Sequence, residues 1–510
     1  METRKKNDEI LIIMNIVWSV MAVIVNYFMN FLITPYVTNN IGVEAYGFVA
    51  LATTFTNYVD IISIGLNAFA GRFISIAYHK NDKTRANLFY SSVIIADIIL
   101  ALLVLMPSAY VIFRLEIFLN IPTAITKDVK ILFLTILLKY LLTVLRTAFN
   151  SATFITNRLD IYESHQSFSY VLQAVLLLGL CVLFPPHVWY VGLAGIAASM
   201  YLLIVNERLA RRLTPDLTFQ KKLCSIKAVK ELVSAGLWNS VNNLGNVLNS
   251  GLDLLITNLL IDATALGQVS IAKNLGTICY TLVMKISGSF RPKQLKLYAE
   301  NKIEEQVALY KQTMKITGAL CSLIICVFYI CGQDFLKLWI PQQDIPFIFK
   351  ITMIVLLSDI AIGVVNPLYY VFTLTKKLKI PCAITITMGV LNVASMYLLI
   401  QYTSMGAYAV VITTLVLNFV HFIDTPLYSA YCLKVKFTTF YPTIIRHMIV
   451  LGVGLAMSRV MNALIPVAES WGTLVVKAGI ATVILLTLLV LLMFSPKEIR
   501  DFVRKIRNGK

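Results

Sequence analysis

About fourteen apolar runs, each long enough to cross a membrane, follow one another along this chain. A spanning helix needs roughly 20 mostly apolar residues, because the hydrocarbon core is about 30 Å thick and each residue rises about 1.5 Å. A 510-residue chain that is 58% hydrophobic and only 14% charged does not have the composition of a soluble globular protein. We therefore expect an all-α polytopic membrane protein. Its spans lie at roughly 12–36, 46–70, 88–109, 130–150, 167–184, 190–207, 232–260, 265–289, 309–331, 347–372, 381–400, 406–429, 444–464 and 471–494.

Basic residues mark one side of the membrane. The net charge of +18 is carried by short clusters between the apolar runs, beginning with Arg4, Lys5 and Lys6. Such clusters are typical of cytoplasmic loops rather than of nucleic-acid binding. No Lys or Arg occurs in the loops at 38–45, 185–189, 261–264, 401–405 and 465–470. This asymmetry predicts that both termini are cytoplasmic and that nucleic acid is not a partner.

The eight cysteines are scattered and lack CxxC or CxxH spacing. Most fall inside apolar runs, where a free cysteine behaves as a small buried hydrophobic residue. The sequence therefore predicts no disulfide framework, metal site or cofactor.

A ladder of polar residues runs along Leu232–Ile261, which is long enough to span the bilayer as one helix. At 100° per residue its polar side chains fall within about a 120° arc, opposite Leu, Val and Ile. They are Asn239, Asn242, Asn243, Asn246, Asn249, Ser250, Asp253 and Thr257. Polar groups facing lipid would be unsatisfied, so this stripe must face protein or a watery cavity. Amides that hold neighbouring helices together in a packed bundle are the alternative.

The same stripe recurs about 220 residues earlier. Subtracting 220 from Asn246 and Ser250 gives Asn26 and Asn30, and the register continues into the segments that follow. Ala45, Gly47 and Val49 correspond to Ala265, Gly267 and Val269. With one residue of slippage, 156–159 corresponds to 375–378. A nearly constant offset over several landmarks indicates internal duplication.

The offset spans six helices, so the two repeats have the same orientation in the membrane. We expect an N-terminal lobe of helices 1–6 at 1–207 and a C-terminal lobe of helices 7–12 at 232–429. Residues 430–510 form helices 13 and 14 and a basic cytoplasmic tail. The cytoplasmic connector, 208–231, interleaves apolar and basic residues. It is either a basic helix lying on anionic lipid or an ordinary positively charged loop.

Ionisable residues inside the spans are the sharpest functional candidates, because each is costly there unless it is paired or hydrated. The carboxylates are Asp60, Asp97, Asp253 and Asp359, and the cations are Lys139, Arg146, Lys273 and Lys285. His421 and Asp424 have the i,i+3 spacing of a local pair, which is more typical of a structural contact than of a proton relay. Arg459 and Lys477 lie near helix ends, where long side chains can reach the interface.

The chain resembles a known superfamily at this level. Two parallel six-helix repeats followed by two extra helices are similar to the multidrug/oligosaccharidyl-lipid/polysaccharide exporter superfamily. The segment ITPYVTNNIGVEAYGFVAL at 33–51, with Gly42, Tyr46 and Gly47 between the first two helices, resembles the start of Wzx-type polysaccharide transporters. The resemblance covers essentially the whole chain.

This resemblance implies a flippase rather than an enzyme. Such a protein moves undecaprenyl-diphosphate-linked oligosaccharide from the cytoplasmic to the outer leaflet of the bacterial inner membrane, for O-antigen, capsule or exopolysaccharide synthesis. Other polysaccharide assembly proteins are implied as partners, beside membrane lipids, and coupling to H+ or Na+ is open. Related lipid II flippases have arginines in the first helix, where this chain has Asn26 and Asn30. A lipid II substrate is therefore not indicated.

A lipid-linked diphosphate sugar needs cations for its phosphates and amides for its hydroxyls. We expect the diphosphate to bind Lys139, Arg146, Lys273 and Lys285. Contacts to sugar are expected from Asn26, Asn242, Asn246 and Asn249. Charge balance or ion coupling is expected from Asp60, Asp97, Asp253 and Asp359. The alternative is that these charges pair across helices and only hold the bundle together.

Two other functions remain in view. A cation-coupled drug or metabolite antiporter of the same superfamily would favour a more acidic and aromatic cavity. A membrane polysaccharide polymerase or ligase would need an external loop rich in His, Asp and Arg, and no external loop here exceeds about 20 residues.

Overall fold

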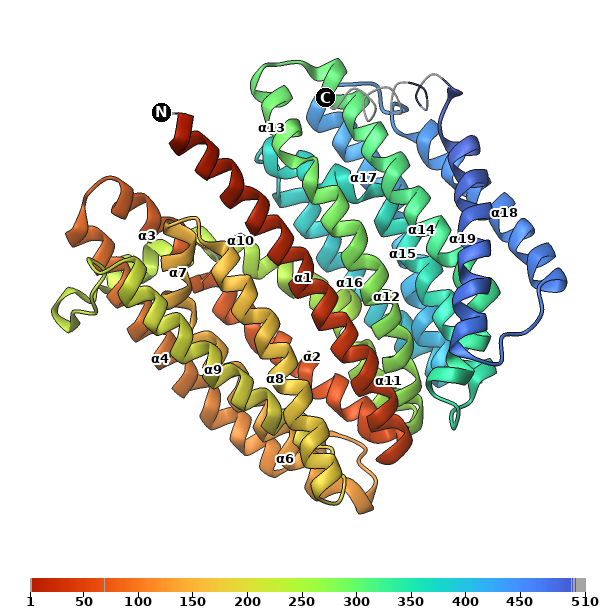
Figure 1. Cartoon of the computed structure of the whole chain (residues 1–510), viewed down its shortest axis with the longest axis horizontal. Coiled ribbons are helices and arrows are strands. Elements are labelled where there is room, and N and C mark those ends of the chain that lie inside the picture. Colours follow the sequence, from red (N-terminus) through yellow and green to blue (C-terminus); the bar gives the residue numbers. More distant parts are fainter. Residues whose placement is uncertain (1, 68, 497, 499, 501–510) are drawn as a thin grey trace. The chain divides into compact units, whose positions relative to one another are not determined.

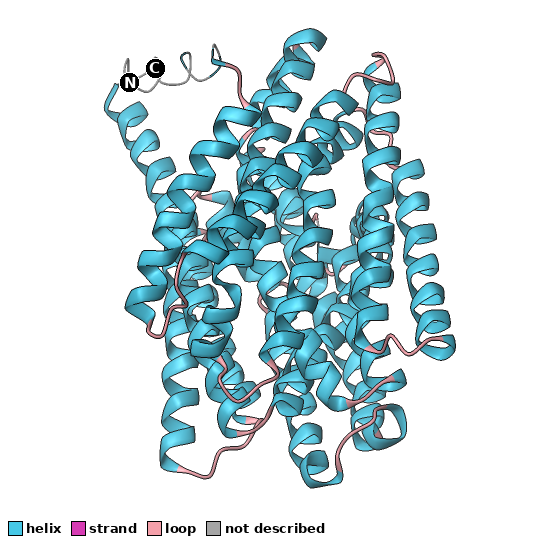
Figure 2. Cartoon of the chain, turned by 90° about the vertical axis from the view of Figure 1, so that its right-hand side faces the viewer, coloured by secondary structure: helices cyan, strands magenta, loops and turns pink. Residues whose placement is uncertain are grey.

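The described regular structure of this computed structural model is entirely helical (Figures 1 and 2). The structure describes residues 2–67, 69–496, 498 and 500, without the side chains of residues 2–13, 15, 16, 20 and 238. The α-helices are α1 (Glu2–Asn40), α2 (Val43–Asn67), α3 (Ala70–His79), α4 (Lys83–Phe113), α5 (Leu115–Phe118), α6 (Thr126–Leu145), α7 (Thr147–Ile155), α8 (Leu159–Leu183), α9 (Tyr190–Leu213), α10 (Ile226–Asn246), α11 (Asp253–Leu260), α12 (Ala263–Ser289), α13 (Arg291–Ala299), α14 (Ile303–Trp339), α15 (Ile345–Leu374), α16 (Lys379–Tyr402), α17 (Ala407–Leu433), α18 (Tyr441–Leu464) and α19 (Trp471–Met493). Most of the basic tail, residues 501–510, lies outside the description, as do the side chains of Arg4, Lys5 and Lys6.

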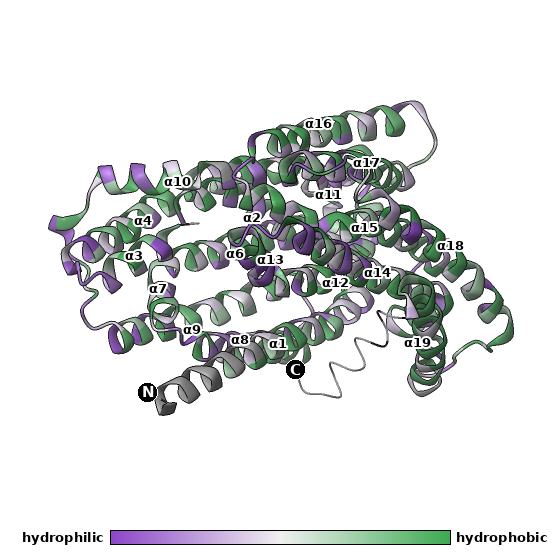
Figure 3. Cartoon of the chain, turned by 90° about the horizontal axis from the view of Figure 1, so that it is seen from above, coloured by the Kyte–Doolittle hydropathy of each residue, from purple (hydrophilic) through white to green (hydrophobic). Residues whose placement is uncertain are grey.

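The helices follow the predicted membrane spans closely. Within the described residues, eleven helical stretches are long and apolar enough to cross a membrane. Figure 3 shows the apolar character of such helices, for example α18 and α19. The other three predicted spans correspond to α6, to α10 with α11, and to α12, which are not among the eleven. These are the segments that carry the predicted substrate-binding cations and most of the amides. The predicted all-α polytopic architecture is confirmed.

The chain divides into two compact units, Met1–Gly267 and Gln268–Lys510. In the first unit α2 packs against α10, and α6 packs against α9. The α2–α10 contact is close, since a Cβ on Gly236 would lie 2.0 Å from the carbonyl oxygen of Gly65. The helix that begins the second predicted repeat therefore packs on the first. The predicted lobe boundary at 208–231 remains a prediction.

Equivalent residues of the two predicted repeats meet in the first unit. Gly47 of α2 and Gly267 of α12 correspond at an offset of 220, and a Cβ on Gly47 would lie 2.7 Å from the Gly267 amide nitrogen. One turn earlier, the Thr264 hydroxyl donates to Glu44 Oε1 at 2.9 Å, again between residues 220 apart. This crossing needs glycine because the two backbones are in contact.

In the second unit α14 is the central helix. It packs against α15 on one side and against α18 and α19 on the others. Small residues make room along these contacts: the His447 ring lies against Gly318, and the Cys326 sulfur lies against Gly454. The core is apolar and fully buried at residues such as Ile325 and Leu485. The two helices beyond the predicted repeat are thus docked on α14.

The amide-bearing span is not the single α-helix that its length predicted. A π-helical turn, Val247–Gly251, separates α10 from α11, and the Leu252 amide donates to the Val247 carbonyl at 3.0 Å. A π turn inserts one residue into the helix, so the residues after it are rotated by about 100°. Asp253 is accordingly 4% exposed, whereas Asn242 and Asn246 before the turn are exposed. The predicted stripe is therefore split into two faces.

The connector is hydrogen-bonded to α4. Its first residues, 208–213, end α9, its last residues, 226–231, begin α10, and a short 3-10 turn, Lys221–Leu223, lies between them. The Thr218 amide donates to Asn87 Oδ1 at 2.8 Å, and the Gln220 amide donates to the Ser91 hydroxyl at 2.9 Å. The part of the connector between α9 and α10 is thus fixed by side chains of α4, and whether its basic residues lie on anionic lipid or form an ordinary positively charged loop remains a prediction. The Asn87 and Ser91 side chains of α4 therefore provide hydrogen-bond partners for backbone amides of the connector that are not paired within a helix.

Candidate functional site

Lys139 lies in the middle of α6 and faces α9. A Cβ on Gly195 of α9 would lie 2.7 Å from Lys139 Cδ and 3.5 Å from its Nζ, so the glycine forms a notch for the lysine side chain. Among the described residues, the ammonium group has no hydrogen-bond or ion-pair partner. Placing an uncompensated cation in a membrane span costs about 3 kcal/mol. Within the described chain, Lys139 is therefore a cation inside a predicted span with no anionic partner.

Arg146 lies seven residues further on, where α6 ends and α7 begins. It is 8% exposed, and its Nε has no hydrogen-bond partner in the described structure. A guanidinium offers five N–H donors in a planar fork that suits phosphate oxygens. Among the described residues, Lys139 and Arg146 thus share the property of lacking a carboxylate partner.

Asp60 belongs to a hydrogen-bonded cluster between α2 and α6. Its Oδ1 accepts from the Tyr140 hydroxyl at 3.0 Å and from the Ser63 hydroxyl, and the two hydroxyls lie 2.9 Å apart. α6 therefore presents Lys139 to α9 and the adjacent Tyr140 to α2. The carboxylate is held by neutral donors rather than by either predicted cation.

Asp97 of α4 is the most deeply buried of the four predicted carboxylates. It is 1% exposed, and its Oδ1 accepts from the Asn67 amide at 2.9 Å. Its Oδ2 and the Asn67 Oδ1 are buried without a hydrogen-bond partner among the described residues. Two adjacent acceptor oxygens in this state suit a proton or a small cation better than an anionic substrate.

The predicted sugar-binding amides are available to different degrees. Asn242 and Asn246 are exposed, and Asn26 and Asn249 are half-buried. The Asn26 side chain is already engaged, because Asn30 Nδ2 donates to Asn26 Oδ1 at 3.2 Å. Within the described part of the chain, the side-chain amides of Asn242 and Asn246 donate to no protein acceptor. These two are the amides best placed to bind a ligand hydroxyl.

The second unit contributes a cation–carboxylate neighbourhood. Asp359 of α15 interacts electrostatically with Lys273 of α12, and its Oδ2 lies 3.0 Å from the position of a Cβ on Gly276. That oxygen is buried without a hydrogen-bond partner in the described structure. Lys285, three turns further along α12, is exposed. Lys273 thus has a charge-balancing neighbour, as the alternative to substrate binding expected, whereas Lys139 and Arg146 do not.

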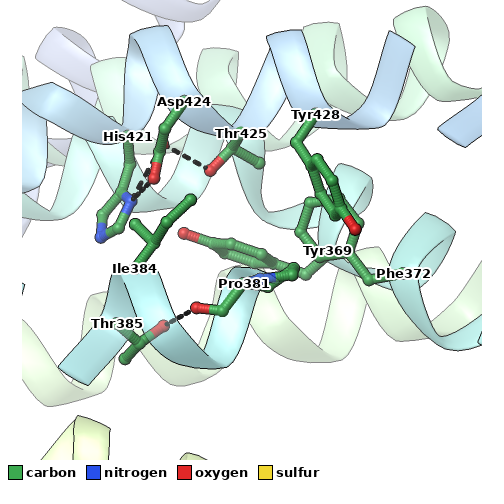
Figure 4. Close-up of a pocket in the computed structure, with 9 residues that line it drawn as sticks. All are labelled: Tyr369, Phe372, Pro381, Ile384, Thr385, His421, Asp424, Thr425 and Tyr428. Atoms are coloured by element: carbon green, nitrogen blue, oxygen red, sulfur yellow. Dashed lines mark hydrogen bonds and ion pairs between the residues drawn. The ribbon is translucent and has the colours of Figure 1, made fainter. Parts of the chain in front are cut away.

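A small pocket opens between α15, α16 and α17 (Figure 4). His421 and Asp424 of α17 lie on one side of it, with the His421 Nδ1 3.1 Å from both carboxylate oxygens. The Thr425 hydroxyl donates to Asp424 Oδ1 at 3.0 Å. The rings of Tyr369, Phe372 and Tyr428 form much of the remaining wall. The predicted i,i+3 pair is therefore present, in a pocket that sequence spacing alone did not indicate.

Another buried ion pair corrects an expectation. Lys477 was expected to reach the membrane interface, but its Nζ lies 2.8 Å from Asp334 Oδ2, and both residues are 5% exposed. Asp334 also accepts from the Ala468 amide at 3.0 Å. The partners are 143 residues apart, so no local sequence signal could have paired them. The same holds for Tyr140 and Asn67, which bind the predicted carboxylates from other helices.

A family model described as "Polysaccharide biosynthesis protein" matches residues 12–292, more than half of the chain. The chain belongs to this polysaccharide biosynthesis family. The chain is also 26% identical over 492 residues to "Uncharacterized membrane protein EpsK" of Bacillus subtilis (strain 168), a match that covers 95% of each chain.

Two solved structures have a fold similar to that of this chain. A lipid II flippase, MurJ in an inward closed conformation, superposes with a TM-score of 0.68 at 13% identity, covering 96% of this chain and 100% of that one. An inward-facing multidrug resistance MATE transporter of the MOP superfamily gives 0.65 at 14% identity, covering 82% and 98%. The family member has the fold of these transporters, and the resemblance seen in its sequence is confirmed. It is a member of a polysaccharide biosynthesis family with the fold of these transporters.

Proposed function

We propose that this transporter flips an undecaprenyl-diphosphate-linked oligosaccharide from the cytoplasmic to the outer leaflet by alternating access. The observation that carries the proposal is that two cations, Lys139 of α6 and Arg146 at its C-terminal end, have no carboxylate partner among the described residues. Lys139 and the Nε of Arg146 lack an anionic partner in the described structure, and an intramembrane cation is expensive to leave uncompensated. A diphosphate supplies the missing negative charge, and each charge-assisted hydrogen bond to it contributes about 1.5–3 kcal/mol.

The amides support the sugar part of the substrate. Asn242 and Asn246 are exposed, and each offers both a donor and an acceptor, as a sugar hydroxyl requires. Lys273, Lys285, Asn26 and Asn249 complete the proposed binding set. Asp60, Asp97, Asp253 and Asp359 are proposed to balance charge or to couple an ion. The family and its MurJ neighbour, a lipid II flippase, agree with a lipid-linked substrate.

A cation-coupled drug or metabolite antiporter is the second candidate. It is favoured by the buried carboxylate oxygens of Asp97 and Asp359 that have no hydrogen-bond partner in the described chain. Such oxygens would attract a cationic substrate or a coupling ion. In this case Lys139 and Arg146 would repel the transported cation.

Neutral substitution of the α6 cations distinguishes the two candidates. Lys139→Gln and Arg146→Gln variants would be reconstituted with a polyprenyl-diphosphate oligosaccharide, and its exposure to an impermeant glycosidase would be followed with time. We expect each variant to lower the flipping rate at least about tenfold, because a charge-assisted contact of about 1.5–3 kcal/mol is lost. Folded protein level in the membrane should stay near that of the wild type.

Lys130→Gln is the matched control on the same helix. Its ammonium forms a partly exposed ion pair with Glu116, and such surface pairs contribute little. This variant should flip substrate at the wild-type rate. Normal flipping by a stable Lys139→Gln/Arg146→Gln double variant would exclude the cationic site. Transport of organic cations by the wild type, with no flipping of the lipid-linked sugar, would favour the antiporter.

The proposed orientation places both termini in the cytoplasm of a bacterial inner membrane. Cysteines at Asn40 and Ser404, which are exposed, should react in intact cells with an impermeant thiol reagent. Cysteines at Lys80 and Gln220, also exposed, should react only after the cells are opened. Labelling of Lys80→Cys in intact cells would refute the orientation.

A further inference from the structure

The pocket between α15, α16 and α17 contains an intramembrane acid–base pair that the substrate site does not use. His421 is 7% exposed and the Asp424 side chain 17% exposed. In the described chain, Asp424 forms no ion pair with Lys or Arg. We propose that His421 and Asp424 form a proton-binding site whose occupancy is coupled to transport. This inference rests on the proposed function for the coupling, but not for the binding of the proton.

Charge counting explains why a proton is the ligand. With a neutral imidazole and an ionised carboxylate, the pair has a net charge of −1. One added proton makes the pair neutral, as an imidazolium facing a carboxylate at 3.1 Å. A net charge within a membrane span costs several kcal/mol, so gain or loss of this proton changes the local energy substantially. In the pair the added proton resides on an imidazolium whose charge the adjacent carboxylate compensates, whereas protonating a lone histidine would create an uncompensated positive charge.

The other ionisable side chains around His421 and Asp424 are tyrosines, which carry no charge when they are protonated. The ionisable groups that face the pair are Tyr369 of α15, Tyr428 of α17 and Tyr441 of α18. α16 contributes Pro381, Ile384 and Thr385, none of which titrates. The Lys377 ammonium is turned to another ring, 4.4 Å from the centre of Tyr431. No fixed cation among the described residues therefore replaces the proton.

The pair lies where the helices are easiest to bend. Pro426 follows Thr425 directly and removes one backbone hydrogen bond from α17, and Pro367 does the same in α15. The Tyr441 hydroxyl of α18 donates to the Ile423 carbonyl at 2.8 Å, on the turn between His421 and Pro426. A change in charge at His421 and Asp424 thus acts on a weakened turn of α17, which is a physical route from protonation to helix movement.

The first repeat offers a matched control. In the N-terminal half, His165 of α8 is paired with Tyr201 of α9. The His165 Nδ1 and the Tyr201 hydroxyl lie 2.7 Å apart. This pair has a histidine but no carboxylate, so a proton on His165 would have no negative charge beside it to compensate. His165→Gln should leave coupling unchanged.

Direct proton binding can be tested without transport. The chain has five histidines, so histidine-labelled protein in nanodiscs should give a few assignable imidazole NMR signals. We expect one signal, absent in His421→Gln, to move when the pH is changed. Its pH response should change in Asp424→Asn, which keeps the side-chain shape. A signal that ignores pH, or that moves with Na+ at constant pH, would overturn the proton site.

Coupling is tested in proteoliposomes carrying the lipid-linked oligosaccharide. An imposed pH gradient should alter the wild-type flipping rate, and this effect should fall about tenfold in His421→Gln and Asp424→Asn while His165→Gln retains it. Flipping that occurs but ignores the gradient would refute coupling. A wild type that binds the proton but never flips this lipid would instead refute the proposed substrate and leave the proton site standing. If His421→Gln does not fold, Asp424→Asn decides both readouts.

Discussion

Replacing Lys477 by methionine should undock the last two helices from α14. The substitution keeps the side-chain length but leaves the Asp334 carboxylate buried with one remaining donor, the Ala468 amide at 3.0 Å. Removing one partner of a buried ion pair costs about 3–5 kcal/mol. The entropy of unfolding averages about 2.1 cal/mol/K per residue, which gives about 1 kcal/mol/K for this chain. Lys477→Met should therefore lower Tm by about 3–5 °C.

Thermal unfolding of the detergent-solubilised protein, followed by intrinsic fluorescence, measures this shift. Asp334→Asn combined with Lys477→Met should recover most of the loss, because the asparagine oxygen still accepts from the Ala468 amide and no charge remains. Lys337→Met is the control, since this lysine is exposed on the same turn of α14. An unchanged Tm for Lys477→Met, or a double variant no better than the single one, would refute the argument.

Three further outcomes are expected. Gly195→Ala should slow flipping severalfold at normal protein level, because its Cβ would lie 2.7 Å from Lys139 Cδ, whereas Gly179→Ala, which meets nothing within 4 Å, should have no effect on the flipping assay. Tyr140→Phe should destabilise the protein by about 1.5 kcal/mol in thermal unfolding, because Asp60 loses a donor at 3.0 Å, while Tyr110→Phe on an exposed position should not. Burial raises the pKa of Glu498, but the Lys315 ammonium at 2.6 Å and the hydrogen bonds of Ser495 outweigh it and hold the pKa below its ordinary 4.5. The ionised Glu498 therefore stabilises this tail contact above pH 4.5, and the stabilisation is lost as the pH falls through the lowered pKa. Amide hydrogen exchange at Ser495 should show an additional acceleration in that pH range in the wild type, and the Glu498→Gln variant should not show it.

Most of the secondary structure follows from the sequence because a membrane span has a simple requirement. Every backbone group in lipid must be satisfied within its own segment, so an apolar run of sufficient length becomes a helix. The exceptions lie where polar side chains compensate for irregular backbone. The π turn at Val247–Gly251 has its last carbonyl bound by the Tyr58 hydroxyl at 2.7 Å, and this contact spans 193 residues. A donor so distant in sequence leaves no trace in the local pattern.

The sequence by itself determined which residues are ionisable within the spans and where the helices run. Only the tertiary structure decided the partner of each charge. Asp60 is bound by Tyr140, Asp334 by Lys477 and Asp97 by Asn67, whereas Lys139 has no partner among the described residues. Helical periodicity specifies the direction of a side chain around its own axis, but it carries no information about which helix packs on that side. The chemistry of this protein depends on those contacts between helices.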